Sequence, residues 1–290
     1  NAMDIIVVGK FAGEVALAAV GSTGALINLL TNVFMGLSVG ASVVVAQYYG
    51  AQKHDEASKT VHCSMLVSGI CGLLLAIVGY FSAELLLSWM GTPGDVIKDA
   101  SLYMRIFFIG MPANMLYNFG SSILRAVGDT KRPLYYLTAT GIVNVILNLI
   151  FVINLGMGVD GVAWATVIAQ YLSMILILLN MVRNEGVAHL DFKALRIYKD
   201  KLIQIAKIGL PAGIQGSIFS ISNVLIQSGV NSFGSIAMAG AAAAGNIEGF
   251  VYVAMNSIHQ TAMTFTGQNM GAKKYDRIKN TAWLNALSGI

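Results

Sequence analysis

Four polar side chains that lie in otherwise apolar stretches could together bind a small cation. Asn144 and Asn148 are four residues apart and therefore share one face of a helix. Asn148 and Thr166 each lie nine residues from Met157, where a turn is predicted, so both should sit about 13 Å below that turn. Asp4 precedes another predicted turn and should lie at a similar distance below it, about 12 Å. A carboxylate, two amide oxygens and a hydroxyl at one level would form an oxygen site for Na⁺, or a hydrogen-bonded cage that takes up a proton at Asp4.

Each of these side chains also has an interpretation that involves no ion. An ionisable group in the middle of a membrane costs about 2.5 to 3.5 kcal/mol on insertion scales, so Asp4 requires a compensating partner. That partner could be a neighbouring helix, with the carboxylate hydrogen-bonded purely for packing. The two asparagines could likewise only bind helices together, which is a common use of polar residues in lipid. Spacing alone leaves both interpretations open.

Three further residues are candidates for a substrate cleft. Glu248 is a second deep acid, three turns before His259 on one predicted helix face. It could contribute negative charge to a cleft, or be neutralised by a neighbouring group. Met35 and Met255 could line the same cleft, since methionine adapts to varied apolar cations, although methionines also serve as core and lipid contacts.

The sequence contains no pattern typical of an enzyme active site. HExxH, paired cysteine and histidine spacings, G-x-S-x-G and phosphate-binding loops are all absent, so we expect no enzymatic activity and no cofactor. The net charge of +4 does not indicate a nucleic-acid partner, because the basic residues follow the pattern of a membrane protein.

The elements that must position these residues are membrane-spanning helices. Hydrophobic residues make up 56% of the chain and charged residues 11%, whereas charged residues make up about a quarter of an ordinary soluble domain. Runs without Asp, Glu, Lys or Arg, such as residues 60–83, 133–159 and 161–182, reach the roughly 20 residues that cross a bilayer as a helix. The short alternating segments of a strand barrel are missing. The fold class is therefore predicted to be all-α, as a polytopic protein in the lipid bilayer.

A stretch near the beginning of the chain is written a second time near its end. QYYGAQKHDEASKT at residues 47–60 aligns without gaps with QNMGAKKYDRIKNT at residues 268–281, an offset of 221 residues. Gln47 and Gly50 fall on Gln268 and Gly271, and the match continues upstream for most of seventy residues. The chain is therefore predicted to hold one unit of about 220 residues and the start of a second, related copy.

The distribution of basic residues orients these units. All of the 18 Lys and Arg residues except Lys10, Lys98 and Arg105 lie in or beside the loops that follow even-numbered helices, and such loops stay in the cytoplasm. Both units then share one orientation, with a pseudo-twofold axis along the membrane normal and a cleft between them. We expect residues 1–183 to form a six-helix lobe with an incomplete first helix. Residues 184–202 should form a cytoplasmic linker with an interfacial helix, and residues 203–290 the start of a second, truncated lobe.

Five segments carry a resemblance to a known family. They are NAMDIIVVGKFAGEVALAAVG at residues 1–21, GLSVGASVVVAQYYGA at 36–51, LRAVGDTKRP at 124–133, GMGVDGVAWATVIAQ at 156–170 and TGQNMGA at 266–272. In this order and spacing they resemble the multidrug and toxic compound extrusion (MATE) family, and the resemblance covers the whole chain.

The resemblance implies a twelve-helix antiporter of two six-helix lobes, which exchanges Na⁺ or H⁺ for organic cations or drug-like molecules by alternating access. It implies multidrug efflux across a cell membrane of the bacterial inner-membrane type, with no cofactor other than the coupling ion. Asp4 stands where members carry a coupling acid, Asn144 matches an amide of the same network, and Thr166 matches a hydroxyl. Asn148 departs from the Asp of some members, which leaves the choice between Na⁺ and H⁺ open.

Two alternatives belong with this expectation. A flippase of the same wider superfamily would move lipid-linked oligosaccharides and should have a larger, more cationic cleft. The chain could also be an inactive structural fragment.

Overall fold

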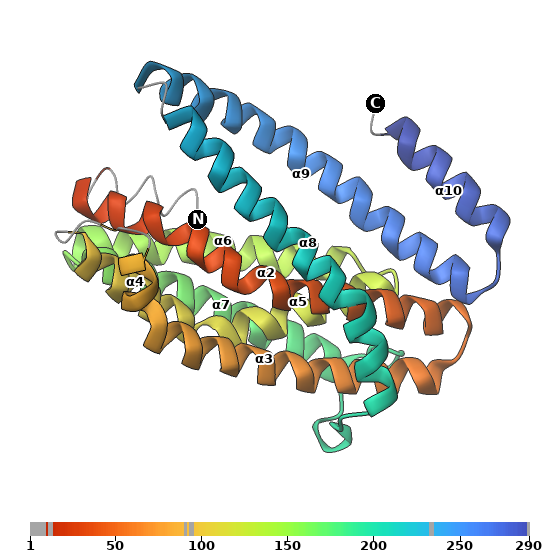
Figure 1. Cartoon of the computed structure of the whole chain (residues 1–290). Helices are drawn as coiled ribbons and strands as arrows, with labels where there is room; N and C mark the ends of the chain where they lie inside the picture. Colours follow the sequence, from red (N-terminus) through yellow and green to blue (C-terminus); the bar gives the residue numbers. More distant parts are fainter. Residues whose placement is uncertain (1–9, 11–13, 90–91, 93–95, 232–234, 289–290) are drawn as a thin grey trace.

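The computed structural model describes residue 10 and residues 14–89, 92, 96–231 and 235–288. Helices account for the regular structure in these ranges (Figure 1). They are α2 (Glu14–Gly50), α3 (His54–Trp89), α4 (Ile97–Ile109), α5 (Met111–Ala126), α6 (Lys131–Leu149), the π-helical turn η1 (Ile150–Asn154), α7 (Val159–Arg183), the 3₁₀ turn η2 (Phe192–Ala194), α8 (Lys199–Asn231), α9 (Ser235–Gly271) and α10 (Tyr275–Ser288).

The predicted spans agree with the helices. Among the described residues, five helices are long and apolar enough to cross a membrane: parts of α2 and α8, and α3, α6 with η1, and α7. Large apolar side chains remain exposed along α3 and α6, among them Phe81 and Tyr135, as expected where a helix faces lipid. The prediction of an all-α membrane protein is confirmed.

One predicted helix is broken in two. The sequence suggests a single helix from Val96 to Leu124, but α4 ends at Ile109 and α5 begins at Met111. Pro112 is the cause, because proline has no N–H to donate and its ring clashes with the carbonyl of the residue four positions earlier. Gly110 lies at the break, where an added Cβ would collide with the side-chain oxygen of Gln170 on α7. The break lets α7 approach closely.

The repeat predicted from the sequence is visible in the backbone. Gln52, after α2, and Lys273, after α9, are 221 residues apart and adopt positive φ angles of 55° and 56°. Each caps its helix in the same way: its own N–H bonds the carbonyl three residues earlier, and the next N–H bonds the carbonyl five residues earlier. These two bonds define the Schellman helix end. The two copies therefore end their second helix identically.

Glycines allow α2 to pack directly against α8. A Cβ on Gly36 would collide with the backbone of Gly213, and one on Gly40 with the carbonyl of Ile205. In the other direction, a Cβ on Gly209 would lie 2.7 Å from the Cα of Leu37. Small residues at a four-residue spacing permit this close backbone approach. Helix α2 of the first unit is thus in contact with the first helix of the second unit (Figure 1).

The segment between the two units is mostly irregular. From Asn184 to Tyr198 its only described helical structure is η2, and the basic stretch from Lys199 onwards forms the first turns of α8. The backbone N–H of Asp191 donates to Nε2 of the buried His62 on α3, at 3.1 Å. This bond holds the segment against the first unit and brings the start of α8 close to α2 and α3.

Candidate functional site

Three of the four residues predicted to bind a cation lie together between α6 and α7. The amide nitrogen of Asn144 donates to Thr166 Oγ1 at 3.3 Å, and that of Asn148 donates to Asn144 Oδ1, also at 3.3 Å. Asn148 is fully buried and Thr166 is buried as well. Asp4, the fourth predicted member, lies outside the described residues.

This cluster belongs to a longer polar seam that the sequence reasoning did not identify. Ser173 on α7 donates to Thr140 on α6 at 2.7 Å, and both are buried. Thr140, Asn144 and Asn148 are spaced by four residues, so they form one ladder along α6. The spacing was a usable signal. The seam ends where α6 becomes the π-helical turn η1, a feature that often marks functional sites and that the sequence did not reveal.

The seam can serve either of the predicted purposes. Asn144 Oδ1 accepts one hydrogen bond and a carbonyl oxygen has two lone pairs, so one remains for a cation. Thr166 Oγ1 likewise accepts one bond and keeps a second acceptor position. The same bonds hold α6 to α7 without any ion. Ion binding by these residues therefore stays a prediction.

The two units meet at the repeated motif. A Cβ on Gly50 would collide with the carbonyl of Gln268, and a Cβ on Gly271 would collide with the carbonyl of Gln47. Gln47 corresponds to Gln268 and Gly50 to Gly271, so the two contacts are the same contact made in both directions. A twofold axis produces such pairs of equivalent contacts, because each half meets the same surface of the other.

One further pair places that axis. Ala46 and Gly267 are equivalent positions, again 221 residues apart, and a Cβ on Gly267 would lie 3.0 Å from the Cβ of Ala46. A residue meets its own counterpart only on the axis. The axis therefore passes between the ends of α2 and α9, at what we call the inner end of the molecule, where α2 and α9 terminate and α8 begins. Gln268 adds a bond to the carbonyl of Ala126 at the end of α5, at 2.7 Å.

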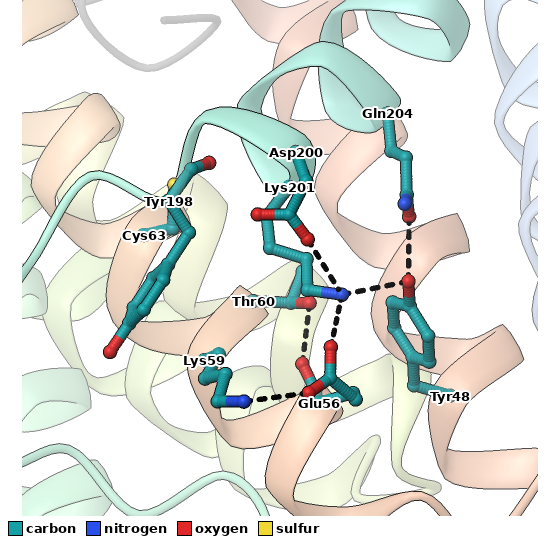
Figure 2. Close-up of polar contacts among 9 residues, drawn as sticks. All are labelled: Tyr48, Glu56, Lys59, Thr60, Cys63, Tyr198, Asp200, Lys201 and Gln204. Atoms are coloured by element: carbon teal, nitrogen blue, oxygen red, sulfur yellow. Dashed lines mark hydrogen bonds and ion pairs between the residues drawn. The ribbon is translucent and has the colours of Figure 1, made fainter.

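A buried lysine joins the units at the same end (Figure 2). Lys201, in the first turns of α8, is 2% exposed, and its Nζ lies 2.5 Å from the carboxylate of Glu56 on α3. It also donates to the hydroxyl of Tyr48 on α2 at 2.8 Å and lies 4.1 Å from the centre of that ring. Tyr48 in turn donates to Gln204 at 2.9 Å, and Asp200 lies 3.2 Å from Lys201 Nζ. We call these five residues the lysine cluster.

The lysine cluster was not predicted. Lys201 stood in a basic stretch that the sequence reasoning assigned to a linker with an interfacial helix. No spacing rule could have paired it with Glu56, which lies 145 residues earlier in the chain. The pair exists because the α2–α3 turn and the start of α8 converge at the inner end.

A cavity of about 700 Å³ lies beside the inner end, between the two units. The first unit contributes Arg125 at the end of α5, with Gly128 and Thr130 from the following turn. The second contributes one face of α9, from Tyr252 to Gln268. This volume is typical of a site for one drug-sized molecule.

The residues predicted to line a cleft are placed elsewhere. Glu248 and Met255 on α9 are exposed, and Met35 on α2 is half-buried against the core of the first unit. Among the described residues that line the cavity, none of these three is found. A role for them in substrate binding stays a prediction.

Comparison with known proteins identifies the architecture. The family model described as MatE matches residues 1–150 and 211–287 of the chain. The chain belongs to the MATE family. MATE proteins are transporters, so the expectation that this chain is not an enzyme is confirmed.

Among curated relatives, the chain is 29% identical over 297 residues to the probable multidrug resistance protein YoeA of Bacillus subtilis (strain 168). That match covers 98% of this chain and 64% of YoeA. The MATE chain thus spans less than two thirds of the length of this relative.

Two solved MATE structures in different conformations match this chain to different degrees. An outward-facing multidrug resistance MATE transporter matches with a TM-score of 0.88 at 25% identity, over 99% of this chain and 63% of that one. An inward-facing structure, also at 25% identity, matches with a TM-score of 0.74 over 98% of this chain and 64% of that one. The described arrangement is therefore more similar to the outward-facing form, in agreement with the contacts that close the inner end.

Proposed function

We propose that the protein is a cation-coupled exporter that uses alternating access, and that the described arrangement is its state closed towards the cytoplasm. The observation that carries this proposal is the reciprocal contact of the repeated motif at the inner end. A pseudo-twofold axis at a closed end lets two equivalent halves rock against each other about a fixed site. The cargo is a drug-like organic molecule, and the protein lies in a cell membrane of the bacterial inner-membrane type.

The basic residues support the orientation. Lys and Arg concentrate in the loops at the inner end, which places that end in the cytoplasm by the charge rule. The closed inner end then faces the cytoplasm, and cargo would leave from the opposite side.

The polar seam between α6 and α7 is the site we assign to the coupling ion, with Asp4 as its carboxylate. An ion that binds there drives export only if it favours one arrangement of the halves over the other. One charge moved through 100 mV supplies about 2.3 kcal/mol, which corresponds to a change in cargo affinity of about fiftyfold. A single Na⁺ or H⁺ can therefore drive useful accumulation.

The experiment is a transport assay with the full-length gene product in proteoliposomes, under an imposed Na⁺ or pH gradient. Asp4→Asn and Thr166→Val should abolish gradient-driven efflux of a fluorescent drug while insertion and monodispersity are kept. Ser222→Ala, on the exposed part of α8, is the matched control and should transport normally. Gradient-driven efflux by Asp4→Asn at the wild-type rate would refute the assignment.

The known proteins that resemble this chain do not favour a flippase. A curated relative, YoeA, is named as a probable multidrug resistance protein, and a solved structure that matches is a multidrug resistance MATE transporter. An inactive fragment gains no support from the described contacts, since the two units are in extensive contact with one another.

A further inference from the structure

We infer that the cavity beside the inner end binds an anionic group, a carboxylate or a phosphate, through Arg125. The inference rests on the proposed function in treating the cavity as part of the cleft between the halves. It goes further in assigning the sign of the charge that the cavity recognises.

Arg125 is a half-buried cation without a counter-charge among the described residues. Its guanidinium donates to Ser122 Oγ at 2.9 Å, and that is the one hydrogen bond described for its side chain. A guanidinium has five N–H donors, so most of its capacity is unused. The nearest acid along the chain, Asp129, is instead paired with Arg132 at 3.4 Å. A partly desolvated guanidinium with free donors favours a planar anion, which it can bind through two parallel bonds.

The rest of the cavity lining also suits an anionic ligand. No carboxylate occurs among its described lining residues, whereas amide and hydroxyl groups line the α9 side at Asn256, Gln260 and Thr264. These three are spaced by four residues, so they form one ladder on the helix face. The amides of Asn256 and Gln260 offer further donors to an anion, whereas the hydroxyl of Thr264 donates to the carbonyl of Gln260 at 3.1 Å. None of the three carries a negative charge that would repel an anion.

The shape of the cavity defines the ligand further. Its α9 wall runs from Tyr252 to Gln268, which lie 16 positions apart and therefore about 24 Å apart along the helix axis. Gln268 bonds the carbonyl of Ala126 beside Arg125, so the cation lies at the inner end of this wall. Tyr252 lies at the other end, and its ring is stacked on Phe219 with the ring centres 6.4 Å apart. The ligand is therefore an elongated amphipathic molecule with its acid towards the cytoplasm and an aromatic or apolar part towards the membrane centre.

The source of the anion can be a dissolved molecule or the headgroup of an anionic lipid, since Arg125 lies near the inner membrane surface. Both present the same chemistry to the guanidinium. The experiment separates them by including phosphatidylglycerol as a competitor.

The test measures equilibrium binding to the purified full-length gene product in neutral detergent, without an ion gradient. Fluorescein and rhodamine 6G share one ring system but differ in charge, the first an anion and the second a cation. We expect fluorescein to bind more tightly than rhodamine 6G. Arg125→Gln should weaken fluorescein binding about tenfold or more, because a hydrogen bond to a charged group is lost. Arg125→Lys should keep part of the affinity.

Arg132→Gln is the matched control, because Arg132 is exposed, is paired with Asp129 and is absent from the described lining of the cavity. It should bind fluorescein like the wild type. Displacement of fluorescein by phosphatidylglycerol would identify the anion as a lipid headgroup, and failure to displace it would identify a dissolved molecule. Both results support the site.

Equal binding of the two dyes, or wild-type fluorescein binding by Arg125→Gln, would overturn the inference. Because no gradient is applied, that result would leave ion-driven export untouched. Conversely, gradient-driven efflux by Asp4→Asn at the wild-type rate would refute the coupling assignment and leave the dye affinities as they are. The two proposals therefore fail separately.

Discussion

Removing the amine of Lys201 should open the inner end. Lys201→Met removes the bonds from Nζ to the Glu56 carboxylate at 2.5 Å and to the Tyr48 hydroxyl at 2.8 Å. A hydrogen bond to a charged group contributes about 1.5 to 3 kcal/mol, and Glu56 is 35% exposed, so we take the lower value of about 1.5 kcal/mol for the net loss. Since these bonds join the two units, the loss falls on the closed state. The ratio of open to closed protein should rise about tenfold.

Two variants sharpen the comparison. Lys59→Met removes the other lysine bound to Glu56, at 2.7 Å, but Lys59 is 45% exposed and lies on the same helix as Glu56. Solvent screens that exposed pair, and its attraction does not depend on the position of the second unit. Glu56→Gln should shift the ratio further than Lys201→Met, by about a hundredfold, because it leaves the buried ammonium without its main partner at a cost of about 3 kcal/mol.

The assay is pulsed electron resonance on spin labels attached through Lys53→Cys and Lys274→Cys in the full-length gene product, with Cys63 and Cys71 replaced by Ala. Both labelled positions are exposed and lie in the two equivalent turns at the inner end. A longer-distance population should grow in the order Lys59→Met, Lys201→Met, Glu56→Gln. If Lys201→Met gives the same distance distribution as Lys59→Met, the cluster does not hold the halves together and the reasoning is refuted.

Two further substitutions test the packing. Gly50→Ala should abolish transport without preventing folding, since its Cβ would collide with the carbonyl of Gln268 only when the inner end is closed. Wild-type efflux by this variant would contradict the close contact between the two units. Gly72→Ala should lower thermal stability by about 1 to 3 kcal/mol, because its Cβ would lie 2.6 Å from the backbone Cα of Pro112, which cannot swing aside. Gly69→Ala, which would meet no atom within 4 Å, should be neutral or slightly stabilising, and equal melting temperatures for the two alanine variants would refute the packing argument.

The sequence predicted the fold well because its main determinants are local or repetitive. Helices that cross a membrane need long apolar runs, and these are directly visible in the residue order. The repeat was visible because Gln47 and Gly50 recur at one offset as Gln268 and Gly271. Their reciprocal packing then follows from symmetry, since equivalent surfaces meet on a twofold axis.

The candidate site was only partly predictable. Counting residues from one turn predicted that Asn148 and Thr166 lie at the same depth, and the four-residue spacing placed Asn144 on the same helix face as Asn148. In the structure Asn144 donates a hydrogen bond to Thr166, and Asn148 donates one to Asn144. Lys201 was missed because its partner is set by how distant helix ends converge, which no short-range pattern encodes. The polar ladder of α9 was present in the sequence, at Asn256, Gln260 and Thr264, and a search for polar residues at helical spacing would have found it.

A disulfide across the twofold axis tests the central claim most directly, namely that export requires the inner ends of α2 and α9 to separate. Ala46→Cys and Gly267→Cys would place two Cβ atoms close to 3.0 Å apart, in a chain whose Cys63 and Cys71 are replaced by Ala. A disulfide needs about 3.8 Å between its Cβ atoms, so a shift of under about 1 Å between the two helices lets it form. The account predicts that the oxidised full-length protein in proteoliposomes does not transport and that a reductant restores efflux. Efflux by the fully oxidised protein at the rate of the reduced one would contradict it.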